Sequence, residues 1–173
     1  MNLLFYLISA LFFISSIIIC YQDFKTRLVS LWVLITLVIS CFCSVVILRD
    51  FTTLINNLIG AIIYFSFIWL VLKFYLFLKY KKFKIIMNQF LGMADVIVML
   101  SLGSTFNNIG LIFFFCFGFT VALISFFVYV LFKKGIHETN VPLAGLLVIS
   151  YILYVIILNF IQPNYLIDCS FLI

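Results

Sequence analysis

Long apolar stretches joined by short polar segments make up most of this chain. Six can be distinguished, with ends placed to within several residues, at roughly 3–21, 29–48, 54–78, 88–107, 110–132 and 141–161. Each is close to the ~20 residues that an α-helix needs to cross about 30 Å of hydrocarbon. Because a backbone in lipid must satisfy its own hydrogen bonds, we expect all six to be helices. A transmembrane barrel would instead show alternating segments of about 10 residues.

The composition leaves too few polar side chains to cover a surface in water. Of the 173 residues, 68% are hydrophobic and 9% are charged, whereas a soluble domain carries about 25% charged residues. This excludes the soluble and disordered classes and predicts an all-α polytopic membrane protein with about six transmembrane helices. No repeat or linker divides the sequence, so residues 1–173 are expected to form a single transmembrane domain. Basic residues follow the first stretch rather than precede it, so we expect a retained helix and not a signal peptide.

Basic residues predict the orientation. Nine of the ten Lys and Arg residues mark one face: Lys25, Arg27, Lys73, Lys79, Lys81, Lys82, Lys84, Lys133 and Lys134. Only Arg49 falls on the other side. Since cytoplasmic loops are enriched in Lys and Arg, the marked face should be cytoplasmic and both termini should lie outside.

Neither metal chemistry nor nucleic-acid binding is expected. The five cysteines contain no C-x-x-C pair, and four of them lie inside apolar stretches, where cysteine usually acts as a small hydrophobic residue. A disulfide framework, a zinc site or another cofactor is therefore not predicted. The basic residues cluster in short loops without interleaved aromatic residues, so the lipid bilayer is the expected partner and nucleic acid is not. The oligomeric state is not predicted.

Acidic residues are scarce, and two stand out by position. Asp23 directly follows the first apolar stretch, and Asp95 lies within the fourth; both are expected in the cytoplasmic half. If the fourth helix begins near Gln89, Asp95 lies about 9 Å along it. A charged Asp in the middle of a membrane helix costs roughly 2.5–3.5 kcal/mol, so Asp95 should face protein or water and have a raised pKa. The alternatives are a packing acid bonded to Ser, Thr or Lys for Asp95 and a solvated carboxylate for Asp23.

Two carboxyl groups in one poorly solvated pocket would share a proton, because both cannot ionise easily. One could then activate a water molecule as a base while the other polarises a carbonyl group, as aspartic peptide hydrolysis requires. A Ser–His or Cys–His alternative is not expected, because the only histidine, His137, stands alone in a basic segment.

Three motifs resemble those of the type IV prepilin peptidases. The segment 23–30 begins with Asp23, contains a Thr-Arg step and resembles the family's first catalytic motif. Residues 92–95, Gly-Met-Ala-Asp, resemble the second motif, G-x-G-D, in a G-x-A-D form. Residues 141–145 resemble a third, Pro-containing element at the start of the last helix. The order of the motifs and the six-helix topology extend this resemblance over essentially the whole chain.

The resemblance implies a membrane aspartic endopeptidase in which Asp23 and Asp95 are the catalytic pair. It implies a bacterial inner-membrane enzyme that cleaves the basic leader from prepilin-like or pseudopilin-like substrates, before an apolar helix, at the cytoplasmic face. The residues expected to support the pair are Thr26, Arg27, Gly92, Ala94 and Pro142. The chain resembles the short, peptidase-only form, because it contains no paired C-x-x-C motifs of an N-terminal methyltransferase domain.

Several positions depart from the family pattern. Proline is usual where Ser30 stands and frequent where Gly145 stands, Leu31 replaces a common asparagine, and Ile97 replaces a common lysine. These departures leave substrate preference open, and with it the possibility of a divergent or inactive member.

Two rival functions remain open at this stage. A small proton-coupled transporter would use Asp95 as a relay together with Asp50 or Asp168 on the outer side. A non-catalytic membrane scaffold would bind a pilin-like helix without cleaving it.

Overall fold

The apolar stretches form helices throughout the part of the chain that the computed structural model describes, residues 3–26, 28–80, 92–132 and 143–161. These residues form six helices and no strand: α1 (Leu3–Thr26), α2 (Leu31–Leu48), α3 (Phe51–Tyr80), α4 (Met93–Gly103), α5 (Asn108–Phe132) and α6 (Leu143–Ile161). The prediction of an all-α chain is therefore confirmed for the described residues.

Within the described residues, four helices are long and apolar enough to cross a membrane. The qualifying segments are Leu3–Thr26, Leu31–Leu48, Phe51–Val71 and Asn108–Ser125. The other two apolar segments are shorter, and α4, with 11 residues, is about 16 Å long, roughly half the thickness of the hydrocarbon. The described chain is thus all-helical with four helices that could span a membrane, whereas the number of crossings and their direction stay predictions.

The fourth helix is shorter than the stretch 88–107 suggests. Gly92 precedes it in an extended conformation (φ −72°, ψ 149°), and residues 88–91 lie outside the described part. The helix ends at Gly103, where a tight turn follows in which the Thr105 N–H donates to the Leu102 carbonyl oxygen at 3.2 Å. Asp95 therefore lies in the first turn, about 3 Å from the start of α4, and the expected depth of about 9 Å is corrected.

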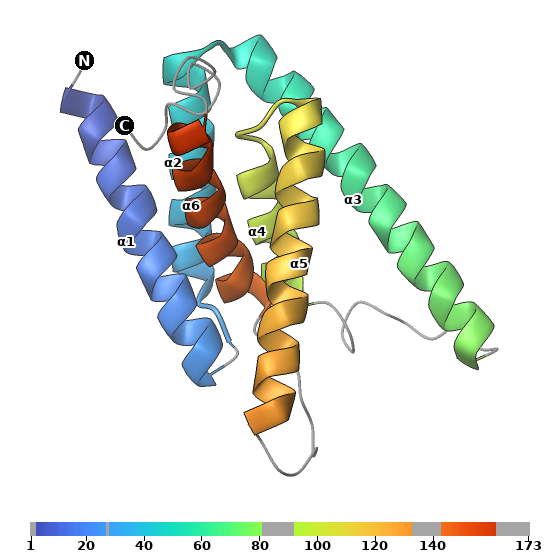
Figure 1. The fold of residues 1–173 in the computed structure, drawn as a ribbon. Helices are drawn as coiled ribbons and strands as arrows, with labels where there is room; N and C mark the ends of the chain where they lie inside the picture. The colour runs from blue at the N-terminus through green and yellow to red at the C-terminus, as the bar shows by residue number, and fades with distance from the viewer. Residues whose placement is uncertain (1–2, 27, 81–91, 133–142, 162–173) are drawn as a thin grey trace.

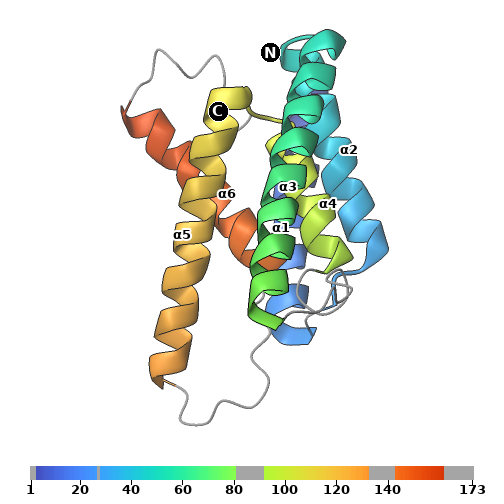
Figure 2. The same ribbon diagram turned by 90° about the vertical axis from the view of Figure 1, so that its right-hand side faces the viewer.

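The helices alternate in direction along the chain (Figure 1). The ends of α1, α3 and α5 and the starts of α2, α4 and α6 all lie at the lower end in that view, which we term the aspartate end because it holds Asp23 and Asp95. The short α4 packs against α2, α3 and α6, and α1 packs against α2 and α6. Figure 2 shows that α6 crosses the bundle obliquely and that α3 and α5 extend beyond the starts of α4 and α6 at the aspartate end.

Aromatic residues form the centre of the core. The ring of Tyr151 on α6 lies 5.4 Å from Phe12, 5.3 Å from Phe106 and 5.7 Å from Phe114, measured between centroids. This cluster joins α1, α5, α6 and the turn after α4. Since lipid is as apolar as these side chains, close packing rather than exclusion from water holds such helices together.

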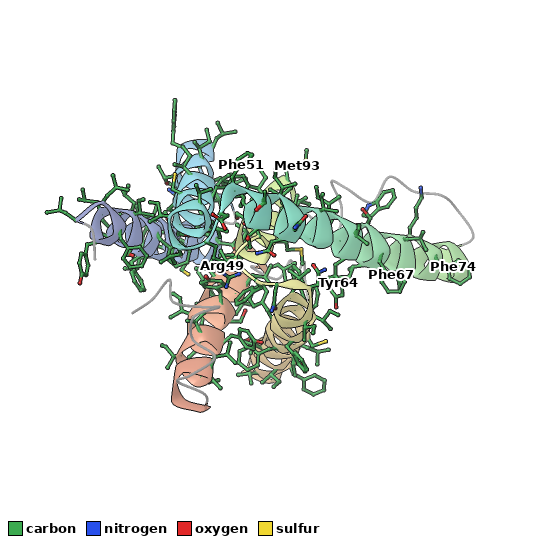
Figure 3. All side chains as sticks on the ribbon, turned by 90° about the horizontal axis from the view of Figure 1, so that it is seen from above. Arg49, Phe51, Tyr64, Phe67, Phe74 and Met93 are labelled. Atoms are coloured by element: carbon green, nitrogen blue, oxygen red, sulfur yellow. The ribbon has the colours of Figure 1, made fainter. Side chains whose placement is uncertain are left out.

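One helix leaves the bundle. The Tyr64 ring of α3 stacks on Phe115 of α5 at 5.2 Å. Beyond this contact α3 extends away from the other helices, with Phe67 and Phe74 along its free part (Figure 3), and both side chains are exposed. These aromatic side chains are suited to contact with lipid.

Candidate active site

Asp23 is a buried residue of the last turn of α1. Its side chain is 6% exposed, and the Gly145 N–H at the start of α6 donates to its Oδ2 atom at 2.6 Å. The interpretation of Asp23 as a solvated surface carboxylate is therefore wrong. A charge-assisted bond of this kind is stronger than a bond between neutral groups, and it ties the end of α1 to the start of α6.

Asp95 is partly buried and binds backbone N–H groups. The Gly92 N–H donates to its Oδ2 atom at 3.0 Å, and the Ala144 N–H also bonds its carboxylate. The first N–H groups of a helix have no partner within the helix, so a carboxylate near the starts of both α4 and α6 satisfies donors of both. The described partners are thus backbone groups, not the Ser, Thr or Lys side chains of the packing alternative.

Neighbouring residues of α6 hold the two carboxyl groups. Ala144 bonds Asp95 and Gly145 bonds Asp23, and both donors lie in the first turn of α6. The charge of Asp23 also acts on Asp95. Two acids that are remote in sequence therefore converge at one helix start, where the positive end of the helix dipole favours negative charge.

Burial raises the pKa of Asp95 from its ordinary value of 3.8 to about 6. The N–H donors of Gly92 and Ala144 act in the opposite direction, and the charge of Asp23 raises the pKa further. Asp95 lies outside the four segments that are long enough to cross a bilayer. Near neutral pH this carboxyl group can both hold and release a proton, as a general acid or base must.

The raised pKa predicts how stability responds to an Asp95→Asn substitution. Because the pKa in the folded state is about 6 and the unfolded value is near 3.8, the folded protein prefers the protonated acid. The stability that this preference contributes is complete below about pH 4 and is lost as the pH rises through 6. Asparagine resembles the protonated acid at every pH. The melting temperature of Asp95→Asn in detergent should therefore match that of the wild type at pH 4 and exceed it at pH 8. A difference that is the same at both pH values would contradict the assignment.

The expected supporting residues occupy different places. Gly92 directly precedes α4 and binds Asp95, and Ala94 packs against the core. The Thr26 hydroxyl donates to the Gln22 carbonyl oxygen at 2.8 Å and accepts from the Leu28 N–H at 3.4 Å, so these contacts shape the turn between α1 and α2. Arg27 and Pro142 lie outside the described residues.

Two departures from the family pattern have a local explanation. The Ser30 N–H, at the start of α2, donates to Gln22 Oε1 at 2.8 Å, and the Gly145 N–H donates to Asp23. Proline lacks an N–H group and could make neither bond. At both positions this chain instead has a backbone N–H group that donates to a side chain near the end of α1.

Sequence reasoning missed the residues that surround Asp23. The Cys20 thiol donates to the Gly145 carbonyl oxygen at 3.6 Å, and the Phe24 ring lies against the same glycine. Cys20, Asp23 and Phe24 are spaced i, i+3 and i+4, which places them on one face of α1. This spacing was visible in the sequence, but nothing in it indicated which helix the face would meet.

The other acids do not join this site in the described structure. Asp50 directly precedes α3 at the opposite end of the bundle, where its carbonyl oxygen accepts the Leu54 N–H at 3.2 Å. Glu138, Asp168 and the histidine His137 lie outside the described residues.

The fold places the chain among all-helical proteins with segments suited to a bilayer. No known protein family, curated protein or solved structure matches it. The motifs of the sequence and the geometry of the two carboxyl groups are therefore the features that indicate a function.

Proposed function

We propose that this chain is a membrane-embedded aspartic endopeptidase that removes the basic leader from prepilin-like or pseudopilin-like proteins. One observation carries the proposal: Asp23 and Asp95, from two motifs far apart in sequence, bind adjacent N–H groups at the start of α6. Burial of Asp23 and the raised pKa of Asp95 favour a pair that shares one proton.

The pair would hydrolyse a peptide bond through general acid–base catalysis. The ionised carboxylate takes a proton from water as the water oxygen attacks the scissile carbonyl carbon. The protonated carboxyl group gives its proton to the carbonyl oxygen, which forms a neutral tetrahedral diol. On collapse the C–N bond breaks, the first carboxyl group passes its proton to the leaving amine, and the second recovers a proton from the diol. No covalent link to the enzyme forms.

The direction of the chain in the membrane follows from its basic residues. Lys25 lies at the aspartate end, where α3 and α5 also end, and the sequence places four lysines directly after these two helices: Lys81, Lys82, Lys133 and Lys134. Under the positive-inside rule this end faces the cytoplasm of a bacterial inner membrane and both termini face outward. The apolar helix of a substrate would then approach from the lipid while its basic leader lies near the carboxylates.

Cleavage of a defined substrate tests the proposal. The chain is reconstituted into vesicles of bacterial lipids with a single-helix substrate that has a lysine-rich leader, a glycine and an apolar segment. Mass spectrometry should find a product that has lost the leader at the boundary with the apolar segment. A matched preparation that carries both Asp23→Asn and Asp95→Asn should release none.

Two outcomes would overturn the proposal. Stable binding of the substrate without cleavage by the wild type would favour a non-catalytic scaffold. Proton flux into the vesicles that requires Asp95 but not Asp23, without cleavage, would favour a transporter.

A further inference from the structure

Three residues of α1 meet a single residue of α6. Cys20 donates its thiol proton to the Gly145 carbonyl oxygen, Asp23 accepts the Gly145 N–H, and the Phe24 ring covers the place where a side chain would begin. A Cβ atom at position 145 would lie 3.1 Å from Phe24 Cε2 and 3.3 Å from Asp23 Oδ2. Both separations are shorter than ordinary van der Waals contact, so a side chain would require Phe24 or Asp23 to shift by a few tenths of an ångström.

A shift here affects both carboxyl groups. The N–H groups of Ala144 and Gly145 are adjacent in the chain and rigidly related within the first turn of α6. Movement of this turn away from α1 would lengthen the bond to Asp23 and change the position of the donor to Asp95. Small displacements of catalytic groups have large effects on rate, and about 1 Å can cost around 100-fold.

We propose that Gly145 is a positioning residue for the aspartate pair. Its N–H fixes the position of Asp23. Because Gly145 has no side chain, the face of α1 formed by Cys20, Asp23 and Phe24 can pack closely against α6. This contact brings Asp23 near Asp95. The inference rests on the proposed function for its kinetic consequences, whereas its geometric part does not depend on catalysis.

A matched pair of glycine substitutions tests the proposal. Gly145→Ala adds the crowding atom but keeps the N–H group. Gly118→Ala on α5 adds an atom that would lie 3.2 Å from Leu147 Cδ2 and 3.2 Å from Ser150 Oγ, so it crowds α6 to a similar degree without contacting either carboxyl group. We expect Gly145→Ala to lower kcat about 10- to 100-fold with KM changed less than about twofold. We expect Gly118→Ala to leave kcat within about twofold after correction for folded protein.

A second variant tests whether the crowding against Phe24 causes the loss of activity. In the Gly145→Ala/Phe24→Ala protein the added methyl group gains space, so kcat should return to within about threefold of that of Phe24→Ala alone. Equal losses of kcat in Gly145→Ala and Gly118→Ala, or a loss that Phe24→Ala does not relieve, would overturn the positioning role.

A readout without catalysis separates this inference from the proposed function. Infrared spectra of the protein labelled with ¹³C-aspartate in lipid discs report the carboxylate band of Asp23, which is assigned by its loss in Asp23→Asn. Gly145→Ala should shift this band because the N–H bond changes, whereas Gly118→Ala should leave it in place. If Gly145→Ala shifts the band but the wild-type protein cleaves no substrate, the positioning role is supported and the peptidase function is contradicted. An unshifted band would contradict the positioning role.

Discussion

Replacement of either Asp23 or Asp95 by asparagine is expected to reduce leader cleavage about 10²- to 10⁴-fold, the range that loss of a general acid or base produces. Asparagine is the informative substitution because its side-chain oxygen can still accept the N–H of Gly145 at position 23, or those of Gly92 and Ala144 at position 95. The helix starts thus keep their partners while the exchangeable proton is lost. The measurement is the initial rate of cleavage in vesicles containing equal amounts of folded protein.

Asp50→Asn provides the matched control. Asp50 lies at the opposite end of the bundle, so the same chemical change there should leave the rate within about twofold. Processing by Asp23→Asn or Asp95→Asn at more than a third of the wild-type rate would end the assignment of a catalytic pair. If Asp95→Asn alone were inactive, a single relay acid would describe the site better.

The largest effect on stability is expected from Tyr151→Ala. Tyr151 is 1% exposed and its ring contacts Phe12, Phe106 and Phe114. Truncation leaves a cavity where α1, α5 and α6 meet. Replacement of large core side chains by alanine commonly costs about 3–5 kcal/mol, which corresponds to a fall in melting temperature of about 10 °C for a chain of this size. Thermal unfolding in a mild detergent, followed by circular dichroism, would measure it.

The neighbouring aromatic Phe113 serves as the control for this prediction. It is 62% exposed and lies beside Phe114 on α5, so Phe113→Ala removes a ring without opening a core cavity. Its melting temperature should stay within about 2 °C of the wild type, the range of ordinary surface substitutions. A similar fall for both variants would show that the aromatic cluster does not determine stability.

Hydropathy predicted the six helices but not the ends of α4. The apolar composition continues on both sides of that helix, so Gly92 and Gly103 looked like interior positions of one long stretch. The backbone conformation sets the ends of α4: Gly92 is extended, and the turn after Gly103 reverses the chain before Asn108. Side-chain polarity contains no information on these dihedral angles, so the apolar stretch 88–107 predicted a fourth helix longer than the 11 residues observed.

The two acids could be singled out because acidic residues are so scarce in this sequence. Their partners could not, since the donors are backbone N–H groups that every non-proline residue possesses. Which N–H groups serve as donors depends on the packing of α1 against α6, which brings Gly145 to Asp23.

The contrast in length between α3 and α4 links this site to the surrounding lipid. α3 has 30 residues and spans about 45 Å, whereas α4 spans about 16 Å and starts short of the tip of α3 at the aspartate end. A helix longer than the hydrocarbon layer is accommodated by its own tilt or by local thickening of the bilayer, the usual responses to this kind of hydrophobic mismatch. The short helix cannot adapt independently, so in the proposed membrane topology acyl-chain length would set how far Asp95 lies from the headgroup layer. Membrane thickness would thus become a determinant of how readily water and protons reach the carboxyl pair.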